Sequence, residues 1–255
     1  MKRYSGWIAA LILLAAALLF CFFRGGQEGY VPPLHLAGDI ETCMDTQDLE
    51  ALGTVVKVEL DGQTYRAVAL SEIAERVTLC GSLERILFVA EDGFTAEISG
   101  SSMKDSYLSY TDEEGWRAVN PKHPISANAE FLDRIIFVTA ADGNRGTAVE
   151  ISYGERSWKT TVGSLYGGQT AEYPYPEGEA EKGEYTSAVF TRRIGVTADI
   201  LGVGSAEQLT LTLDSGETFS VSAESGFFQL CGNRLDYINA FSRAKKEGVR
   251  QITAE

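Results

Sequence analysis

Short runs of β-branched and aromatic residues, each broken by a turn signal, constrain the fold of this chain more than any other feature. Residues Val55–Leu60 read VVKVEL, are followed by Asp61-Gly62, and resume with TYRAV at residues 64–68. Asp-Gly between two such runs is the strongest short-range signal for a β-hairpin, because glycine adopts positive φ at little cost. The same pattern surrounds Asp92-Gly93. We therefore expect a strand-dominated α+β fold with few short helices.

One helix and several further strands complete this expectation. Residues 70–77 read LSEIAERV, and their apolar residues recur at helical spacing, with Ser71 as a plausible N-terminal cap. Other apolar runs of strand length occur at residues 86–89, 94–98, 135–138, 149–153, 157–162, 209–213 and 218–221.

The second half of the chain repeats the pattern of the first. Residues 149–162 resemble the hairpin at residues 55–68, and residues 209–221 mirror residues 86–98. A repeat of this length indicates two diverged copies of one strand-rich unit. Hairpins with Asp-Gly turns also look alike in unrelated β-rich proteins, so chance similarity stays open as the alternative.

The expected domain organisation follows from these patterns. Residues 40–140 form the first unit, and residues 141–255 form the second, which contains an acidic insertion at residues 169–184. The insertion reads QTAEYPYPEGEAEKGE, and its proline, glycine and charge content predicts a solvated loop. Its aromatic segment, YPYP at residues 173–176, is either part of a linker or a docking loop for a partner.

An apolar run near the N-terminus predicts a membrane anchor. Residues 7–23 read WIAALILLAAALLFCFF, seventeen positions without a charge. At about 1.5 Å per residue, such a helix just crosses a hydrocarbon core of about 30 Å. The run ends in the bulky residues Phe22 and Phe23 followed by Arg24, where a signal peptidase needs small residues. We therefore expect residues 1–24 to remain as a signal anchor, with a cleaved signal peptide as the alternative. Lys2 and Arg3 predict a cytoplasmic N-terminus and an extracytoplasmic body at the cell membrane, joined by a tether at residues 25–39.

The charge balance argues against several function classes. The chain has a formal net charge of −14, and its first 24 residues hold three of its 22 basic residues and none of its 36 acidic ones. The remaining body therefore carries −17 and would repel nucleic-acid phosphates and anionic lipid headgroups, so we expect no nucleic-acid partner. The chain has two histidines, His35 and His123, which makes a histidine-based zinc site or a Ser-His-Asp triad a poor expectation.

Several of these segments occur in an order that resembles a known family. Residues 65–73 (YRAVALSEI), a short gap and residues 86–94 (ILFVAEDGF) are similar to the oxidoreductase molybdopterin-binding domain of the sulfite oxidase superfamily, which has many exported bacterial members. Residues 191–202 (TRRIGVTADILG), followed by residues 209–216 (LTLTLDSG), are similar again. The resemblance implies a sulfite-oxidase-like fold over residues 55–138 and, more loosely, over residues 186–237.

The same resemblance implies a candidate site. Residues 229–234 (QLCGNR) resemble, shorter by one residue, the Cys-x-Gly-Asn-Arg stretch around the molybdenum ligand of that family. It implies Cys231 as the metal ligand, with Arg234, Arg192 and Arg193 as candidate groups for the pterin phosphate. A soft thiolate suits molybdenum, and nearby cations keep such a thiol deprotonated. In the family this stretch precedes much of the domain, whereas here it lies close to the C-terminus.

Two functions follow as expectations. The first is a binding or accessory protein that keeps this scaffold without a cofactor and acts beside a membrane redox protein. The second is a molybdopterin-dependent oxidoreductase that uses Cys231, and a structural envelope protein is a third alternative. The stretch around Cys231 offers few cations for a phosphorylated cofactor, chiefly Arg234, Arg243, Lys245 and Lys246, which favours the first function.

The exported body would carry three cysteines, Cys43, Cys80 and Cys231. One disulfide between the sequence neighbours Cys43 and Cys80 is one arrangement, and closing that loop would stabilise the fold. Three reduced thiols are the alternative, favoured because nothing marks a disulfide-dense scaffold.

Overall fold

Strands dominate the computed structural model, which describes residues 31–168, 171–176 and 190–255. For residues 171–176 and 190–194 it describes the backbone alone. Among the described residues the longest helix spans only the eight residues Leu70–Val77. The prediction of a strand-rich fold with few short helices is therefore confirmed. Residues Pro33–Glu255 form one compact unit, and Met1–Pro32 belong to a separate one.

The first half of the larger unit contains nine strands and four short helices. In chain order they are β1 (Leu34–Gly38), β2 (Met44–Thr46), η1 (Glu50–Leu52), β3 (Val55–Leu60), β4 (Gln63–Ala69), α2 (Leu70–Val77), β5 (Leu83–Ala90), β6 (Thr95–Ser99), η2 (Gly100–Asp105), β7 (Tyr107–Thr111), β8 (Gly115–Val119), η3 (Ile125–Ala127) and β9 (Leu132–Thr139).

The second half contains ten described strands and one described helix. They are β10 (Ala148–Tyr153), β11 (Arg156–Thr161), α3 (Val162–Tyr166), β12 (Ala171–Pro176), β13 (Phe190–Val196), β14 (Gln208–Leu213), β15 (Thr218–Ser222), β16 (Gly226–Cys231), β17 (Arg234–Asn239), β18 (Lys245–Lys246) and β19 (Val249–Ala254).

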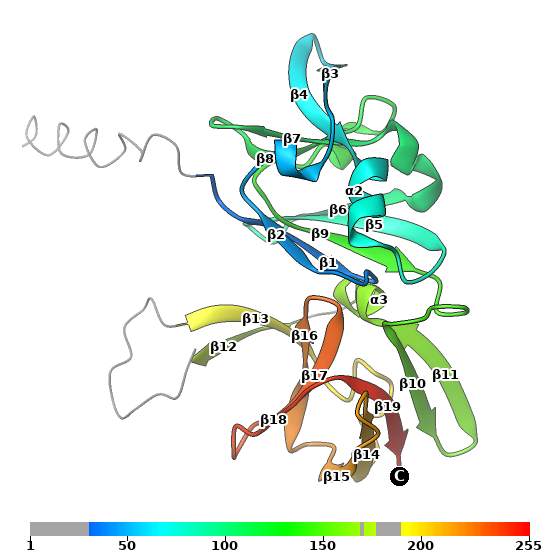
Figure 1. Ribbon diagram of the computed structural model, residues 1–255. Coiled ribbons are helices and arrows are strands. Elements are labelled where there is room, and N and C mark those ends of the chain that lie inside the picture. The colour runs from blue at the N-terminus through cyan, green and yellow to red at the C-terminus, as the bar shows by residue number, and fades with distance from the viewer. Residues whose placement is uncertain (1–30, 169–170, 177–189) are drawn as a thin grey trace, which may run out of the picture. The chain divides into compact units, whose positions relative to one another are not determined.

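Two five-stranded sheets follow the same strand order (Figure 1). One runs β2-β1-β9-β5-β6, and the other runs β11-β10-β19-β14-β15. In each sheet one pair is parallel, β1 with β9 and β10 with β19, while the other pairs are antiparallel. The remaining sheets, β3-β4-β7-β8 and β12-β13-β16-β17-β18, also correspond strand by strand, apart from the additional β18. The strand orders thus equate residues 34–139 with residues 148–254.

This equivalence differs in one place from the sequence comparison. Hairpin β14–β15 takes the place of β5–β6, as the similarity between residues 209–221 and 86–98 suggested. Hairpin β10–β11, which the sequence comparison matched with β3–β4, instead takes the place of β1–β2. Tight hairpins share a sequence pattern wherever they occur, and the strand that pairs alongside them decides their position in the fold.

The local signals for the first hairpin and the helix are well matched by the structure. Asp61 and Gly62 both have positive φ, 51° and 83°, as the two-residue turn of a tight hairpin requires. Helix α2 has the expected bounds and buries its four apolar residues. Ser71 is not its cap, since the N-cap is Ala69 and the N–H of Leu70 donates to the carbonyl of Ser106 at 2.9 Å.

Two segments expected to be irregular form strands instead. The end of the expected tether, residues 34–38, is β1, in which Leu34 and Leu36 are buried and the backbone pairs with β2 and β9. Part of the expected insertion loop, residues 171–176, is the edge strand β12, paired antiparallel with β13. Proline lacks an N–H, and an edge strand tolerates it because one side of the strand needs no partner.

The expected anchor at residues 1–24 lies outside the described residues, as do residues 25–30 of the tether and residues 177–184 of the insertion. Among the residues that the structure describes, no helix has the length and apolarity needed to cross a membrane.

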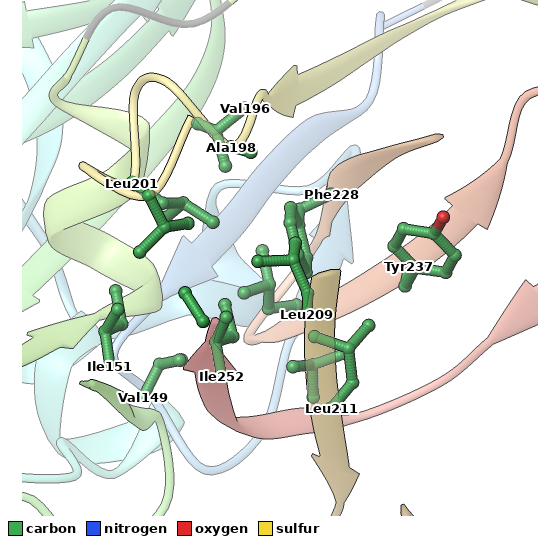
Figure 2. Close-up of a cluster of buried hydrophobic side chains, with 14 of the residues drawn as sticks. Val149, Ile151, Val196, Ala198, Leu201, Leu209, Leu211, Phe228, Tyr237 and Ile252 are labelled. Atoms are coloured by element: carbon green, nitrogen blue, oxygen red, sulfur yellow. The ribbon is translucent and has the colours of Figure 1, made fainter. Parts of the chain in front are cut away.

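Apolar side chains from two sheets form the core of the second half. Figure 2 shows Val149, Ile151 and Ile252 of the sheet β11-β10-β19-β14-β15. It also shows Phe228 and Tyr237, which belong to hairpin β16–β17 of the other sheet. The rings of Phe228 and Tyr237 meet edge to face, with their centroids 5.5 Å apart. Burial of this surface is the main force that holds the hairpin on the sheet.

A buried carboxylate joins the two halves of the larger unit. Asp39 directly follows β1 and is fully buried. Its Oδ1 accepts hydrogen bonds from the Thr147 hydroxyl at 2.6 Å and the Gly163 N–H at 2.8 Å. Its Oδ2 accepts one from the N–H of Thr139 at 2.8 Å. Because Thr147 and Gly163 belong to the second half, one side chain ties both halves together.

Candidate functional site

The residue implied as a metal ligand, Cys231, lies at the tip of hairpin β16–β17. Cys231 pairs with Arg234 across a two-residue turn, in which Gly232 has a φ of 62°. The turn docks on the first half of the unit, because the carbonyl of Gly232 accepts a hydrogen bond from the N–H of Gly38 at 3.1 Å. The Asn233 amide also donates to the carbonyl of Ile40 at 2.9 Å. Cys231 is therefore held on a firmly positioned hairpin.

The cations beside Cys231 are already engaged by carboxylates. Asp236 is fully buried and accepts from Arg234 Nε at 2.7 Å, from Lys245 Nζ at 3.0 Å and from the N–H of Gly248 at 3.0 Å. Glu247 forms an ion pair with each of these two cations, with its Oε1 at 3.2 Å from Arg234 Nη2 and 2.9 Å from Lys245 Nζ. Little positive potential is left over for a phosphate group.

This environment keeps the thiol of Cys231 protonated. Burial and the neighbouring Asp236 raise the pKa of Cys231 to about 11, against the opposing effect of Lys245 and Arg234. A thiolate, not a thiol, is the metal ligand and the nucleophile. Without a cation at the sulfur, the surroundings of Cys231 therefore do not favour the thiolate that molybdenum binding needs.

We expect Cys231 to react with iodoacetamide much more slowly than the cysteine of a synthetic peptide QLCGNR at pH 7. A pKa near 11 leaves a thiolate fraction roughly 100-fold below that of a free cysteine. The rate should then rise about tenfold per pH unit up to pH 10, as more thiolate forms. Peptide mass spectrometry after timed labelling measures this rate, and reaction at the peptide's rate at pH 7 would contradict the environment described.

The other implied phosphate groups lie on a neighbouring strand. Arg192 and Arg193 belong to β13, which pairs antiparallel with β16 at Val196 and Phe228, so the backbone runs beside the strand that ends at Cys231. The side chains of Arg192 and Arg193 lie outside the described residues.

The three cysteines in the described part of the chain are free thiols. The structure therefore contains no disulfide between Cys43 and Cys80. Cys43 lies against the turn of the Cys231 hairpin, where a Cβ added to Gly232 would lie 2.6 Å from its Sγ. Cys80 is buried beside Gly146, where such a Cβ would lie 3.1 Å from the Cys80 Sγ. The two sulfur atoms thus pack against different segments.

These observations test whether a molybdenum pterin suits the site. The described residues around Cys231 supply a protonated thiol, a buried carboxylate and two cations that this carboxylate already binds. A soft metal needs a thiolate, and a pyrophosphate needs several free cations. The described residues therefore do not fit this cofactor.

A second candidate site is an open depression in the surface, which we name the Phe131 cleft. It has a volume of about 330 Å³ and lies between the β5–β6 turn and residues 125–131. Its apolar wall consists of Phe94, Ile125 and Phe131, which are 49%, 81% and 49% exposed. Asp92 and Glu130 also line it. A cleft of this size can take one large side chain.

Phe131 adopts a backbone conformation that is rare for an aromatic residue. Its φ is +50°, in the left-handed region that favours glycine. Its N–H donates to the carbonyl of Glu114 at 2.9 Å, and its carbonyl accepts from the N–H of Glu91 at 2.9 Å. The ring packs near Gly115, where an added Cβ would lie 3.2 Å from its Cδ1. The backbone is thus fixed while half of the side chain stays exposed.

The charged side chains that line the cleft, Asp92 and Glu130, are both acidic. Arg117 is almost fully buried and is shared between Glu114, at 2.5 Å, and Glu130, at 3.1 Å. Its guanidinium carbon lies 5.0 Å from the centre of the Tyr65 ring. A smaller pocket is lined by Glu113, Glu114 and Tyr65. Among the described residues, neither pocket is lined by a lysine or arginine.

Sequence reasoning did not single out Phe131, Ile125 or Glu130, and it treated Phe94 only as part of a strand. An exposed phenylalanine and a buried one have the same pattern in the sequence, so burial had to be known first. No protein-family model matches this chain, and no curated protein matches it significantly.

Proposed function

We propose that the protein is a membrane-anchored, extracytoplasmic binding or accessory protein on a sulfite-oxidase-like molybdopterin-domain scaffold that works without the cofactor. The observation that carries the proposal is the ion cluster beside Cys231, in which Asp236 and Glu247 already bind Arg234 and Lys245, the cations that a phosphorylated cofactor would need. Burial and Asp236 also raise the pKa of the Cys231 thiol to about 11. A scaffold with this residue protonated retains the framework of a cofactor site and lacks its chemistry.

The remaining parts of the proposal have separate support. The uncharged run at residues 7–23, preceded by Lys2 and Arg3, supports a single anchor helix with the body outside. The matching strand orders of residues 34–139 and 148–254 support two diverged copies of one unit. The resemblance to exported members of the family supports a membrane redox protein as the partner.

A binding role, rather than a purely structural one, is supported by the Phe131 cleft. Three large apolar side chains are exposed together at its wall, although water disfavours such exposure. Exposed aromatic residues of this kind are enriched where proteins bind partners.

A molybdopterin-dependent oxidoreductase is the second candidate. The resemblance of residues 229–234 to the ligand stretch favours it, and so does the pairing of β13, which carries Arg192 and Arg193, with β16. In that case Cys231 would hold the metal, and Arg234, Arg192 and Arg193 would hold the phosphate.

Metal and pterin analysis separates the two candidates. The full chain, purified from membranes of molybdenum-replete cells, should contain far less than one molybdenum per chain and no pterin. The Cys231→Ser variant is the matched control and should give the same values. Near-stoichiometric molybdenum that disappears in the Cys231→Ser variant would replace the proposal with the oxidoreductase.

The exposed thiol of Cys43 tests the location of the body. In intact spheroplasts, a membrane-impermeant maleimide should label the full chain, and the Cys43→Ser variant should lose most of this label. Permeabilising the cells should add little to the labelling. Labelling that appears only after permeabilisation would place the body on the cytoplasmic side and overturn this part of the proposal.

A further inference from the structure

We infer that the Phe131 cleft binds a polypeptide segment in which a bulky apolar side chain lies next to lysine or arginine. The inference rests on the proposed function as a binding protein and names the class of its ligand. It is carried by a comparison between the two halves of the chain, by the exposed apolar wall and by the charges around the cleft.

Comparison of the two halves shows that Phe131 occupies a position whose backbone conformation favours glycine. Phe131 directly precedes β9, and Gly248 directly precedes the equivalent strand β19. The carbonyl of Phe131 accepts from the N–H of Glu91 at 2.9 Å, and that of Gly248 accepts from the N–H of Asp214 at 2.8 Å. Both positions have positive φ, +50° and +74°. One half thus fills a left-handed position with glycine and the other with phenylalanine.

This difference points to a role for the aromatic ring beyond folding. A phenylalanine at positive φ is strained, and glycine meets the same backbone requirement without strain. The ring is also 49% exposed, so it does not gain the full benefit of burial. Strained residues of this kind cluster at ligand-binding sites, where the surrounding structure holds them in place.

The apolar wall determines what the cleft can hold. Ile125 is 81% exposed, and together with Phe94 and Phe131 it forms one apolar surface around a volume of about 330 Å³. This volume is at the lower end of ligand pockets, which suits a single anchoring side chain. An aromatic or aliphatic anchor in such a pocket is the usual centre of a protein interface.

The charges determine what must flank the anchor. Asp92 and Glu130 line the cleft, and Glu113 and Glu114 line the neighbouring pocket. Arg117, which contacts both Glu114 and Glu130, is buried and already bound by these two carboxylates. The local field is therefore negative and complements lysine or arginine, while anionic lipid headgroups would be repelled.

The experiment uses a displayed library of random seven-residue peptides and the full chain in nanodiscs of zwitterionic lipid, with empty nanodiscs for counter-selection. We expect enrichment of sequences that combine a bulky apolar residue with lysine or arginine. Enriched peptides, resynthesised and titrated, should bind Phe131→Gly at least about tenfold more weakly than the unchanged protein. The double variant Asp92→Asn, Glu130→Gln should bind severalfold more weakly and lose most of its salt dependence.

Two further variants control for folding and for non-specific binding. Ile125→Ser changes a side chain that is 81% exposed, so it should leave stability unchanged and still weaken binding. Phe241→Ser removes another exposed phenylalanine, 85% exposed and outside the cleft lining, and should leave binding unchanged. Phe131→Gly should melt no earlier than the unchanged protein, because it removes backbone strain.

Absence of enrichment, enrichment of acidic sequences, or equal binding to Phe131→Gly and Phe241→Ser would each overturn the inference. Molybdenum analysis and Cys43 labelling do not involve the cleft. A chain without molybdenum, labelled from outside and unable to bind these peptides, would remove this inference and leave the proposed function in place. Stoichiometric molybdenum together with peptide binding would overturn the proposed function and leave the peptide-binding cleft in place.

Discussion

Replacing Asp39 with alanine is expected to lower the free energy of unfolding of the protein by about 3–5 kcal/mol. The carboxylate accepts hydrogen bonds from two buried N–H groups, those of Thr139 and Gly163, and from the hydroxyl of Thr147. Without it these donors lose their partners in a place that water does not reach, and each unpaired donor costs about 1–3 kcal/mol.

The surroundings of Asp39 leave little room for a substitute. A Cβ added to Gly163 would lie 2.7 Å from Asp39 Oδ2, so the α3 backbone approaches the carboxylate as closely as only glycine permits. Asparagine keeps one accepting oxygen but presents an NH₂ group to a donor that needs an acceptor. We therefore expect Asp39→Asn to recover only part of the lost stability.

Urea unfolding followed by circular dichroism measures the effect. Asp45→Ala is the matched control, since the side chain of Asp45 is 70% exposed and its partner is the exposed ring of His35. That variant should change the free energy of unfolding by less than about 0.5 kcal/mol. A loss of less than 1 kcal/mol in Asp39→Ala would mean that the carboxylate does not hold the halves together.

Elements with a strong local signal could be predicted from the sequence. Asp61-Gly62 and the spacing of apolar residues in α2 predicted their elements with near-correct bounds, because both signals act within a few residues. Strand β1 was not recognised, because what makes it a strand is its pairing with β9, almost a hundred residues further along the chain. Long-range pairing of this kind leaves little trace in a single sequence.

The candidate sites divide in the same way. The motif around Cys231 was visible in the sequence, but the ionisation of its thiol depends on Asp236 and on burial. The Phe131 cleft carries no motif, and the equivalence of Phe131 with Gly248 becomes apparent only from the strand order and the matching hydrogen bonds. The matching strand orders of the two halves thus identified a residue that sequence similarity between the halves did not.

Replacing Asp236 with asparagine is expected to lower the free energy of unfolding by about 2–3 kcal/mol at pH 7. Asp236 is fully buried and binds Arg234 and Lys245, which are about a third exposed and can turn partly toward water when the charge is lost. The same change should lower the pKa of Cys231, because the Asp236 carboxylate raises it. Alkylation of Cys231 at pH 8 should therefore become faster in folded Asp236→Asn protein.

The effect of Asp236 on stability should also depend on pH. Burial raises the pKa of Asp236, but hydrogen bonds from Arg234, Gly248 and Lys245 outweigh it and leave the pKa below its ordinary value. A carboxylate of this kind stabilises the fold fully above its unfolded pKa of about 3.9, and the stabilisation is lost as pH falls through the folded pKa.

The stability difference between the unchanged protein and Asp236→Asn should accordingly be constant from pH 8 to pH 5 and shrink below about pH 4. Urea titrations at pH 3, 4, 5 and 8 measure it. Asp105→Asn, which removes a partly exposed carboxylate paired with the exposed Lys122, is the control and should show a much smaller difference throughout. A difference that grows as the pH falls from 8 to 4 would mean that folding raises the pKa of Asp236, and the ion cluster beside Cys231 would then need a different description.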